Sequence, residues 1–332
     1  MNRAVTRNDV AKLANVSPAI VSYVLNNSNY VSEEKREAVL QAISALNYIP
    51  NQLARGLKTN RSSQFAFVCD NIQTELFETV EESLFEKGYY LSLNYSRDTE
   101  GFLEMLVSRQ LDGIFMATNM FSSSQLNYIA DKNIPIILYK TKEYKDLDPR
   151  VKAVAPNYYD AVKKSVNYLA LKGHTCIGMI PPLKYRTKGL EGDDYRARAF
   201  KKSLELHNLA VSEDLICTKT KTVADIYESV FSMLSNPNPK LRPTSLVVGN
   251  DYLAAQIIQY LKKLNISVPR DLAVVGCDNT RIAELTTPAL TSVDVSKERL
   301  AEAYVSKMLD LVNGKEVEGE YTDVHLIIRE SA

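Results

Sequence analysis

The chain has 332 residues, 45% of them hydrophobic and 24% charged, so we expect a globular protein with more than one domain. Its 40 basic and 40 acidic residues cancel, and no segment approaches about 18 uninterrupted apolar residues, which argues against a membrane span and a membrane partner. Four widely separated cysteines without a CxxC pair and three scattered histidines predict no metal site, no cofactor and a cytoplasmic protein with reduced thiols.

The stretch NDVAKLANVSPAIVSYVLN, residues 8–26, predicts two short helices joined by a tight turn. Thr6 is a good N-cap for the first helix, and Asp9 three residues later completes a capping-box pattern. Asn15 falls where the chain must turn sharply, and asparagine tolerates the left-handed conformation that such a turn needs. The spacing of three and four positions predicts a buried face made of Val10, Leu13 and Ala14.

We expect the second helix to be capped by Ser17, with Pro18 in its first turn, where a missing N–H costs nothing. Its predicted apolar face consists of Val21, Val24 and Leu25. The opposite face has small and hydrogen-bonding groups and no acid, which suits a helix that lies in a DNA groove; its residues are Pro18, Ala19, Ser22, Tyr23 and Asn26. A helical hairpin with a solvated face is the alternative that periodicity alone leaves open.

A third helix is predicted after Ser32, an N-cap followed by Glu33 and Glu34, which suit the positive end of the helix dipole. Its buried stripe is expected at Val39, Ala42, Ile43 and Leu46. Residues 1–61 hold eight Lys or Arg against four acids, a balance of +4 that leaves −4 for the rest of this neutral chain. The basic charge expected of a nucleic-acid partner is therefore local to the N-terminal segment.

The run DVAKLANVS, followed by VSYVLN, closely resembles the DNA-binding head of the LacI/GalR family of bacterial repressors, whose usual form is DVAxxAGVSxxTVSRVLN. The resemblance implies an all-α helix-turn-helix head over residues 1–48. By motif position, the base-reading residues would be Pro18, Ala19 and Tyr23, and the phosphate-binding residues Ser17, Ser22 and Asn26.

Two positions depart from the family pattern. Ile20 stands where threonine is usual, and Tyr23 where arginine is frequent. Because an arginine grips guanine with two hydrogen bonds and a tyrosine cannot, we expect an operator that differs from the common family half-site. Ala19 or Ile20 is expected to contact thymine methyl groups, and packing of Ile20 against Val24 is an equal alternative.

Residues 49–63 form the next segment, in which PNQLARGLK resembles the family's hinge helix. A helix of about two turns is marginal in water by itself, so this segment is expected to order only when two copies pair on DNA. The resemblance makes Leu57 the wedge between base steps, Lys58 a minor-groove contact and Leu53 the contact with the partner hinge. The alternative is a flexible linker whose leucines dock on the following domain.

From Gln64 onward, short apolar runs alternate with amphipathic stretches, which predicts doubly wound parallel sheets in two lobes. The predicted strands are Phe65–Cys69, Leu91–Tyr95, Gly113–Ala117, Pro135–Tyr139, Ile177–Ile180, Ser245–Val248 and Leu272–Val275. Helical patterns include Leu76–Lys87, Tyr158–Lys172, Ala197–His207, Tyr252–Leu264 and Lys297–Leu311.

The runs DGIF, KGHTCIGMI, VVGNDYLAA, ISVPRDLAVVGCDN, PALTSV and LIIRES resemble landmarks of the family's periplasmic-binding-protein-like core. The resemblance implies an effector-binding core over residues 64–332, with three crossings between lobes. Lobe one would hold about 64–160 and 293–322, and lobe two about 161–292 and 323–332, with a ligand at the carboxyl ends of the strands.

Carried over residue by residue, the effector-binding side chains are Arg196 in DYRARAF, Asn250 in GNDY and Asp278 in GCDN. Arginine and asparagine donate and aspartate accepts, a set that suits a polyhydroxylated or polar ligand, although each residue singly also fits a structural ion pair. Asp251 is expected to cap the following helix instead. The loop CDNIQTEL is shorter than usual, Pro156-Asn157 replaces the usual DN, and the loop PPLKYRTKGLEGDDY is long and partly charged. These departures leave the effector open.

We interpret the chain as a homodimeric transcription regulator, most simply a repressor, that is nucleoid-associated in the cytoplasm and binds operator DNA. Its affinity for the operator would be set by a small polar ligand, a sugar or sugar derivative. GxGxxG, GxxxxGK[ST] and GxSxG are all absent, so we expect no enzyme and no catalytic residues. A transport-type binding protein fits the core but not the attached head. Two further alternatives keep the fold: control by a protein corepressor, and a ligand-binding core with a non-functional DNA head.

Overall fold

The structure is a computed structural model that describes residues 5–26, 28, 30–49, 61–70, 74–97, 99, 101–183 and 195–332. The chain divides into two compact units, Met1–Ser62 and Ser63–Ala332. Within the described ranges, no helix has both the length and the apolar character needed to cross a membrane.

The first unit contains α1 (Arg7–Leu13), α2 (Pro18–Leu25) and α3 (Glu33–Ala45). The predicted capping box of α1 is confirmed, since Thr6 accepts from the Asp9 N–H and its own N–H donates to Asp9 at 2.8 Å. Asn15 has a φ of 52°, the left-handed turn expected there. One part of the predicted face is wrong, because Leu13 is 56% exposed and Ala11 is buried in its place. Ser32 stands at the N-cap of α3 but makes no side-chain capping bond.

The head's core is small and made of short apolar side chains from all three helices. Val10, Val21 and Val39 are fully buried. Tyr48, which lies beyond α3, closes this cluster. A core of this size gives little stability to spare.

The second unit holds two sheets, and both lobes are confirmed. All strand pairs of the first sheet are parallel, in the order β10-β5-β4-β3-β1-β2. Its strands are β1 (Gln64–Cys69), β2 (Tyr90–Tyr95), β3 (Gly113–Ala117), β4 (Ile136–Leu138), β5 (Val151–Pro156) and β10 (Glu320–Thr322).

The second sheet has the order β11-β9-β8-β7-β6. It departs from the all-parallel expectation, because β11 runs antiparallel to β9. Its strands are β6 (Ile177–Ile180), β7 (Ser245–Val248), β8 (Ala273–Cys277), β9 (Thr291–Asp294) and β11 (His325–Ile327). The strands β5, β9, β10 and β11 were not predicted, since they are short or carry polar residues that break an apolar run.

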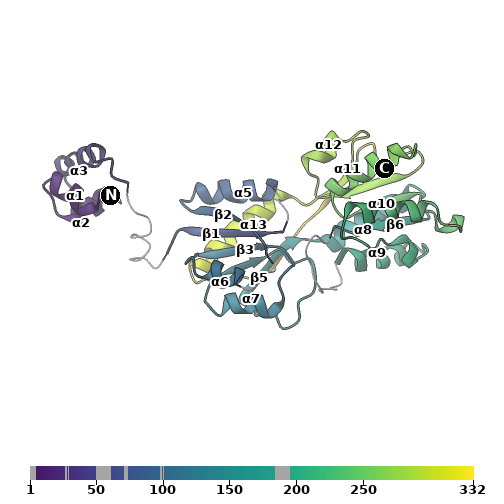
Figure 1. The fold of residues 1–332 in the computed structure, drawn as a ribbon, viewed down its shortest axis with the longest axis horizontal. Coiled ribbons are helices and arrows are strands. Elements are labelled where there is room, and N and C mark those ends of the chain that lie inside the picture. The colour runs from purple at the N-terminus through teal and green to yellow at the C-terminus, as the bar shows by residue number, and fades with distance from the viewer. Residues whose placement is uncertain are drawn as a thin grey trace. The chain divides into compact units, whose positions relative to one another are not determined.

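Helices cover both faces of each sheet (Figure 1). Alternate residues of a strand face opposite ways, so Phe65 and Phe67 meet α5 (Thr74–Phe85) and α13 (Lys297–Val312). Ala66 and Val68 meet α6 (Phe102–Val107) and α7 (Ser123–Ala130) on the other face.

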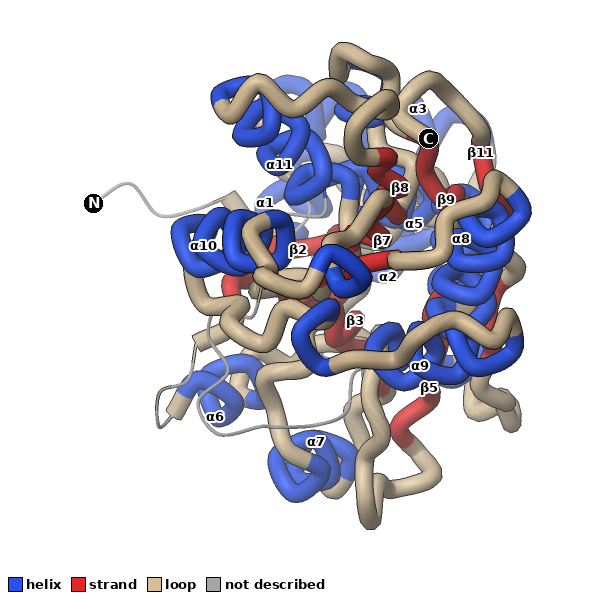
Figure 2. Tube along the Cα trace, turned by 90° about the vertical axis from the view of Figure 1, so that its right-hand side faces the viewer, coloured by secondary structure: helices blue, strands red, loops and turns tan. Residues whose placement is uncertain are grey.

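In the second lobe, α10 (Val223–Leu234) and α11 (Asp251–Lys263) cover one face of β7 and β8. On the other face lie α8 (Tyr158–Leu171) and α9 (Tyr195–Leu206), as Figure 2 shows. The short helix α12 (Arg281–Leu285) packs on α11.

The chain passes between the two sheets three times: between β5 and α8, between β9 and α13, and between β10 and β11. The first two crossings differ slightly from the expected positions. The expected boundary after residue 292 would cut β9, which belongs to the second sheet and ends at Asp294. The expected boundary after residue 160 would cut α8, which starts at Tyr158. Because each crossing follows a strand's carboxyl end, the segments that join the lobes lie beside the polar groups described next.

Candidate functional site

The outer face of α2 has the character that a DNA-reading helix needs. Ser17 accepts from the Ile20 N–H at 3.4 Å and so begins the helix, with Pro18 at its first position. Tyr23 is 46% exposed. Ser17, Pro18, Ala19 and Asn26 are exposed as well, and Ser22 is half-buried. The face therefore offers hydroxyl and amide groups to a partner while Val21 and Val24 anchor the helix in the head's core.

Arg7 adds a positive charge to this face that the motif did not identify. Its Nη1 donates to the Ser22 hydroxyl at 2.7 Å, from the first residue of α1. Ser22 keeps its own O–H for another acceptor. The Ile20 side chain is half-buried against the head's core, which agrees with the packing alternative, and its contact with thymine methyl groups stays a prediction. The hinge residues Leu53, Leu57 and Lys58 lie outside the described residues.

In the second unit, a chain of hydroxyl groups joins the two lobes. Tyr139 follows β4 of lobe one, Tyr158 begins α8, and Asp278 follows β8 of lobe two. The Tyr158 hydroxyl donates to Asp278 at 3.0 Å, so the short hydrogen bond between the two tyrosines must have Tyr139 as donor. Burial and the nearby Asp278 raise the pKa of Tyr139 well above its usual value, so both hydroxyls stay protonated and can donate.

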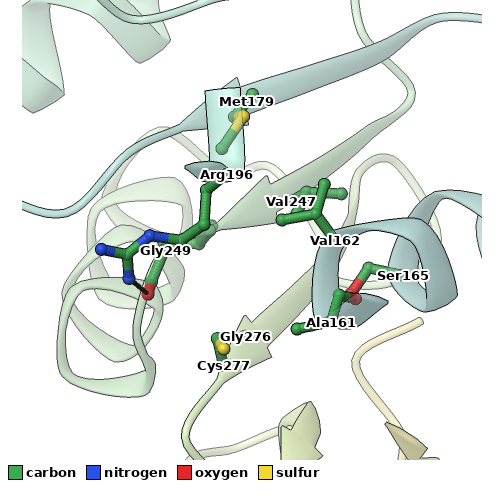
Figure 3. A pocket seen from close by; sticks show the side chains of 10 residues that line it. Ala161, Val162, Ser165, Met179, Arg196, Val247, Gly249, Gly276 and Cys277 are labelled. Carbon is green, nitrogen blue, oxygen red and sulfur yellow. Dashed lines mark hydrogen bonds between the residues drawn. The ribbon is translucent and has the colours of Figure 1, made fainter. Parts of the chain in front are cut away.

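Arg196 meets the same tyrosine from α9. Its guanidinium lies over the Tyr158 ring, 4.4 Å from the centroid, and its Nη1 donates to the Gly249 carbonyl at 3.1 Å. Figure 3 shows this bond beside a small cavity of about 10 Å³, which is bounded by Val162, Met179 and Cys277 among others. That volume is at the lower limit for one water molecule, so this cavity cannot hold an effector.

In the structure the cap of α11 belongs to Asn250 and not to Asp251. Asn250 is the N-cap of α11, and its side-chain oxygen accepts from the Leu253 N–H at 2.8 Å. Asp251 is fully buried and accepts from the Ser292 hydroxyl at 2.5 Å and the Thr280 N–H at 2.6 Å. The prediction that Asp251 caps the helix was wrong because a carboxylate one residue further on points into the lobe, toward β9.

Two carboxyl groups thus share a desolvated region. Burial raises the pKa of Asp251 to about 7, with a contribution from Asp278, while its hydrogen bonds act in the opposite direction. Burial also raises the pKa of Asp278, which Arg196 and the Tyr158 hydroxyl partly offset. Asp278 has a φ of 94°, an unusual conformation for a non-glycine residue that often marks a functional position.

Of the three predicted effector residues, two therefore come together. Arg196 and Asp278 both contact Tyr158. The side-chain oxygen of Asn250 accepts the capping bond, so its amide nitrogen is the group that could bind a ligand. Sequence reasoning missed Tyr139, Tyr158 and the interior role of Asp251. Their position at carboxyl ends of strands was the available signal, since doubly wound sheets bind ligands there. Among the described residues, no group of three or more His, Cys, Asp or Glu is placed to hold a metal ion.

Comparison with known proteins matches both units. A family model for bacterial regulatory proteins of the lacI family matches residues 6–51, and a model for a periplasmic binding protein-like domain matches residues 166–332. The HTH-type transcriptional repressor PurR of Photorhabdus laumondii is 31% identical over 96% of this chain and 94% of its own length. The PurR of Proteus mirabilis is 32% identical with the same coverage.

Solved structures share the fold. The lac repressor dimer bound to operator and the anti-inducer ONPF superposes with a TM-score of 0.83 at 21% identity, covering 99% of each chain. A complex of the transcriptional regulator CelR with cellobiose gives a TM-score of 0.69 at 23% identity, covering 99% of this chain and all of the other. At these identities the likeness shows the fold alone.

Proposed function

Because this chain belongs to the lacI family of bacterial regulatory proteins and is a DNA-binding transcriptional repressor with a small-molecule effector, we propose that it acts as a homodimer on a pseudo-palindromic operator and that its effector is a sugar or sugar derivative. Its curated relatives are repressors and not enzymes. A dimer supplies two recognition helices, which suits the two half-sites of such an operator.

In this proposal α2 enters the major groove. Pro18, Ala19 and Tyr23 meet base edges, while Ser17, Ser22 and Asn26 meet phosphates, and Ile20 supports them from the core. The Arg7 guanidinium bonded to Ser22 strengthens phosphate binding because it brings a positive charge to the same place. Tyr23 in place of the frequent arginine predicts an operator without the guanine contact that arginine makes.

Residues 1–48 would form the head, 49–63 the hinge and 64–332 the effector-binding core. Leu57 would wedge between base steps, Lys58 would contact the minor groove and Leu53 would meet the partner hinge. A hinge helix of about two turns is only marginally stable by itself. An effector that binds one state of the core more tightly by about 1–3 kcal/mol would therefore change the pairing of the hinges and hence the affinity for the operator.

The observation that carries the ligand-responsive part is the hydrogen-bonded connection between lobes. Tyr139, Tyr158 and Asp278 link them with groups that a polyhydroxylated ligand can also bind, and Arg196 stands beside them. An effector that takes over these bonds would change how the lobes meet. Control by a protein corepressor remains the second candidate, since a lobe movement can equally be set from outside the cleft. A regulator of chromosomal DNA would act in the cytoplasm.

The test is fluorescence anisotropy of the full-length protein on an operator selected from random DNA, compared with scrambled DNA at two salt concentrations. We expect the selected palindrome to bind about 10³-fold or more tightly. Leu57→Ala should remove this preference, and Leu40→Ala, an exposed leucine of α3, should keep it. Equal affinity for both DNAs at each salt concentration would contradict specific regulation by this head.

A further inference from the structure

A second polar cluster lies in lobe one, where the chain leaves β3 and β4. It consists of Asn119, Thr141 and Lys142. The Lys142 ammonium donates to the Asn119 carbonyl at 2.8 Å, and the Asn119 amide donates to the Thr141 hydroxyl at 2.6 Å. Asn119 therefore holds the other two side chains on either side of itself, and we call this set the lobe-one cradle.

Lys142 is a buried lysine. Its residue is 8% exposed, and its ammonium lies 4.8 Å from the centroid of the Tyr144 ring. Within the described ranges no carboxylate lies within ion-pair distance of it. Burial accordingly lowers the pKa of Lys142, and no acid offsets that effect. A desolvated ammonium whose described partners are one carbonyl and one ring costs stability, which favours a role outside folding.

The cradle has several N–H and O–H groups for which the described residues show no acceptor. Lys142 has three N–H groups and uses one, Asn119 uses one of its two amide N–H groups, and Thr141 keeps its hydroxyl proton. Its acceptors each have at least one donor already: the Asn119 side-chain oxygen accepts from the Tyr144 hydroxyl at 3.3 Å, and the Lys142 carbonyl accepts from the Tyr195 hydroxyl at 3.1 Å. A partner that accepts several hydrogen bonds would use these open donors, and the positive charge of Lys142 favours an anionic one.

An acid close to Tyr144 of this region, Asp70, is already hydrogen-bonded. Asp70 follows β1 and accepts from the Thr118 hydroxyl at 3.2 Å. It helps to raise the pKa of Tyr144, after the larger effect of burial, so it faces the ring's hydroxyl side. Burial and Asp70 together keep Tyr144 protonated, so its hydroxyl can donate to Asn119.

The cradle adjoins the interlobe site along the chain in two places. Tyr139, which begins the hydroxyl chain to Asp278, lies three residues before Lys142. Tyr195 donates its N–H to the Thr141 carbonyl at 3.2 Å, and the next residue is Arg196. A ligand that reaches Arg196 and Asp278 from lobe two therefore has the cradle beside it on lobe one.

We propose that the lobe-one cradle binds an anionic group of the effector, a phosphoryl group in preference to a carboxylate. This rests on the proposed function and narrows its ligand to a phosphorylated polar compound. The ammonium is a point charge with several donors around it, which matches the three oxygens of a phosphoryl group, whereas planar carboxylates are matched best by a bidentate arginine.

The experiment is isothermal titration of the full-length protein with inorganic phosphate at constant ionic strength, with acetate as a second titrant. We expect phosphate to bind with a dissociation constant on the order of 1 mM, and acetate at least about threefold more weakly. Lys142→Met should weaken phosphate binding about tenfold or more, because a charge-assisted bond is lost. Lys132→Met is the matched control, since Lys132 also lies over a tyrosine ring but is exposed, in the turn that follows α7.

Thermal unfolding without phosphate separates a ligand-binding lysine from a structural one. Lys142→Met should unfold at the wild-type temperature or above it, because it removes an uncompensated buried charge. A lower unfolding temperature in both Lys142→Met and Lys142→Gln, or phosphate binding that neither change weakens, would overturn the proposal. Acetate binding as tight as phosphate would overturn the preference for a phosphoryl group. Calorimetry needs no operator, so failure here is distinct from failure of the DNA test.

Discussion

The two lobes present the carboxyl ends of similar sheets, yet they treat their polar side chains in opposite ways. In lobe two, Asp251 accepts from Ser292 and Thr280, and Asp278 accepts from Tyr158. In lobe one, Lys142 is buried and forms no ion pair with a described carboxylate. A buried polar network whose members are all hydrogen-bonded makes a structure rigid, whereas one with open donors can bind a ligand. Lobe two therefore supplies the rigid side of the site, and lobe one supplies the side whose open donors a ligand would bind.

The largest effect that tests this comparison is the pH dependence of lobe two. The folded-state pKa of Asp251 is raised to about 7 from 3.8, so the folded state holds a proton that the unfolded chain releases near pH 4. Its contribution to the free energy of unfolding is fully present below about pH 4 and is lost as pH rises to about 7. The loss is at most about 4 kcal/mol. Urea unfolding at several pH values measures it.

The control is Asp251→Asn, which keeps the shape of the side chain. Its amide oxygen can accept from Thr280, and its amide nitrogen can donate to the Ser292 hydroxyl. We expect the free energy of unfolding of the variant not to fall between pH 4 and 7 as that of the wild type does. Other titrating groups are common to both proteins, so the difference between the two reports Asp251. An identical fall in both proteins would show that Asp251 does not titrate in this range.

Close packing around Asp251 gives the next effect. A Cβ at Gly276 would lie 2.3 Å from Asp251 Oδ1 and 2.7 Å from Leu290 Cδ2, so Gly276→Ala should lower the free energy of unfolding by about 3 kcal/mol. Gly113→Ala is the matched variant in lobe one. Its Cβ would meet the Met308 sulfur at 2.4 Å, but a flexible thioether can move away. Urea unfolding at neutral pH should therefore rank Gly276→Ala as clearly the less stable.

The bridge between lobes gives a smaller effect. Tyr158→Phe keeps the ring under Arg196 and removes the hydroxyl, leaving Asp278 and Tyr139 without their shared partner. We expect a loss of about 2 kcal/mol in unfolding free energy. Tyr139→Phe removes only the end of the chain and should cost about half as much. If the two variants are equally stable, the hydroxyls do not act as a connected chain.

Much of the fold was predictable because it depends on local patterns. Continuous apolar runs such as Gly113–Ala117 and Ile177–Ile180 are buried strands with the predicted bounds. Sequence patterns failed where burial had another cause. The strand β9 is short and contains Ser292, a buried residue whose hydroxyl donates to Asp251, so its apolar pattern is broken. Leu13 fits the helical period of α1 but lies at the edge of a core too small to cover it.

The candidate site was only partly predictable because its contacts join residues far apart in the sequence. Arg196 and Asp278 could be placed by family landmarks. Their common partner Tyr158 is 120 residues from Asp278, and no spacing rule connects them. Asp251 and Asn250 are adjacent and both can cap a helix, so only the direction of each side chain in the folded lobe decides their roles. Lys142 looks like one of many surface lysines until its burial is known.

The smallest effect on stability should come from the lobe-one cradle itself. Thr141→Val keeps the shape of the side chain and removes the hydroxyl that accepts from Asn119. Because Asn119 is partly exposed and can bond water instead, we expect less than about 1 kcal/mol of lost stability. Phosphate affinity should nevertheless fall severalfold, since one donor is lost and Asn119 is less well held. Titration calorimetry checks this against Thr79→Val, whose hydroxyl donates to the Glu75 carbonyl within α5. A large loss of stability with unchanged phosphate binding would contradict the comparison, because the cradle would then be a structural network like that of lobe two.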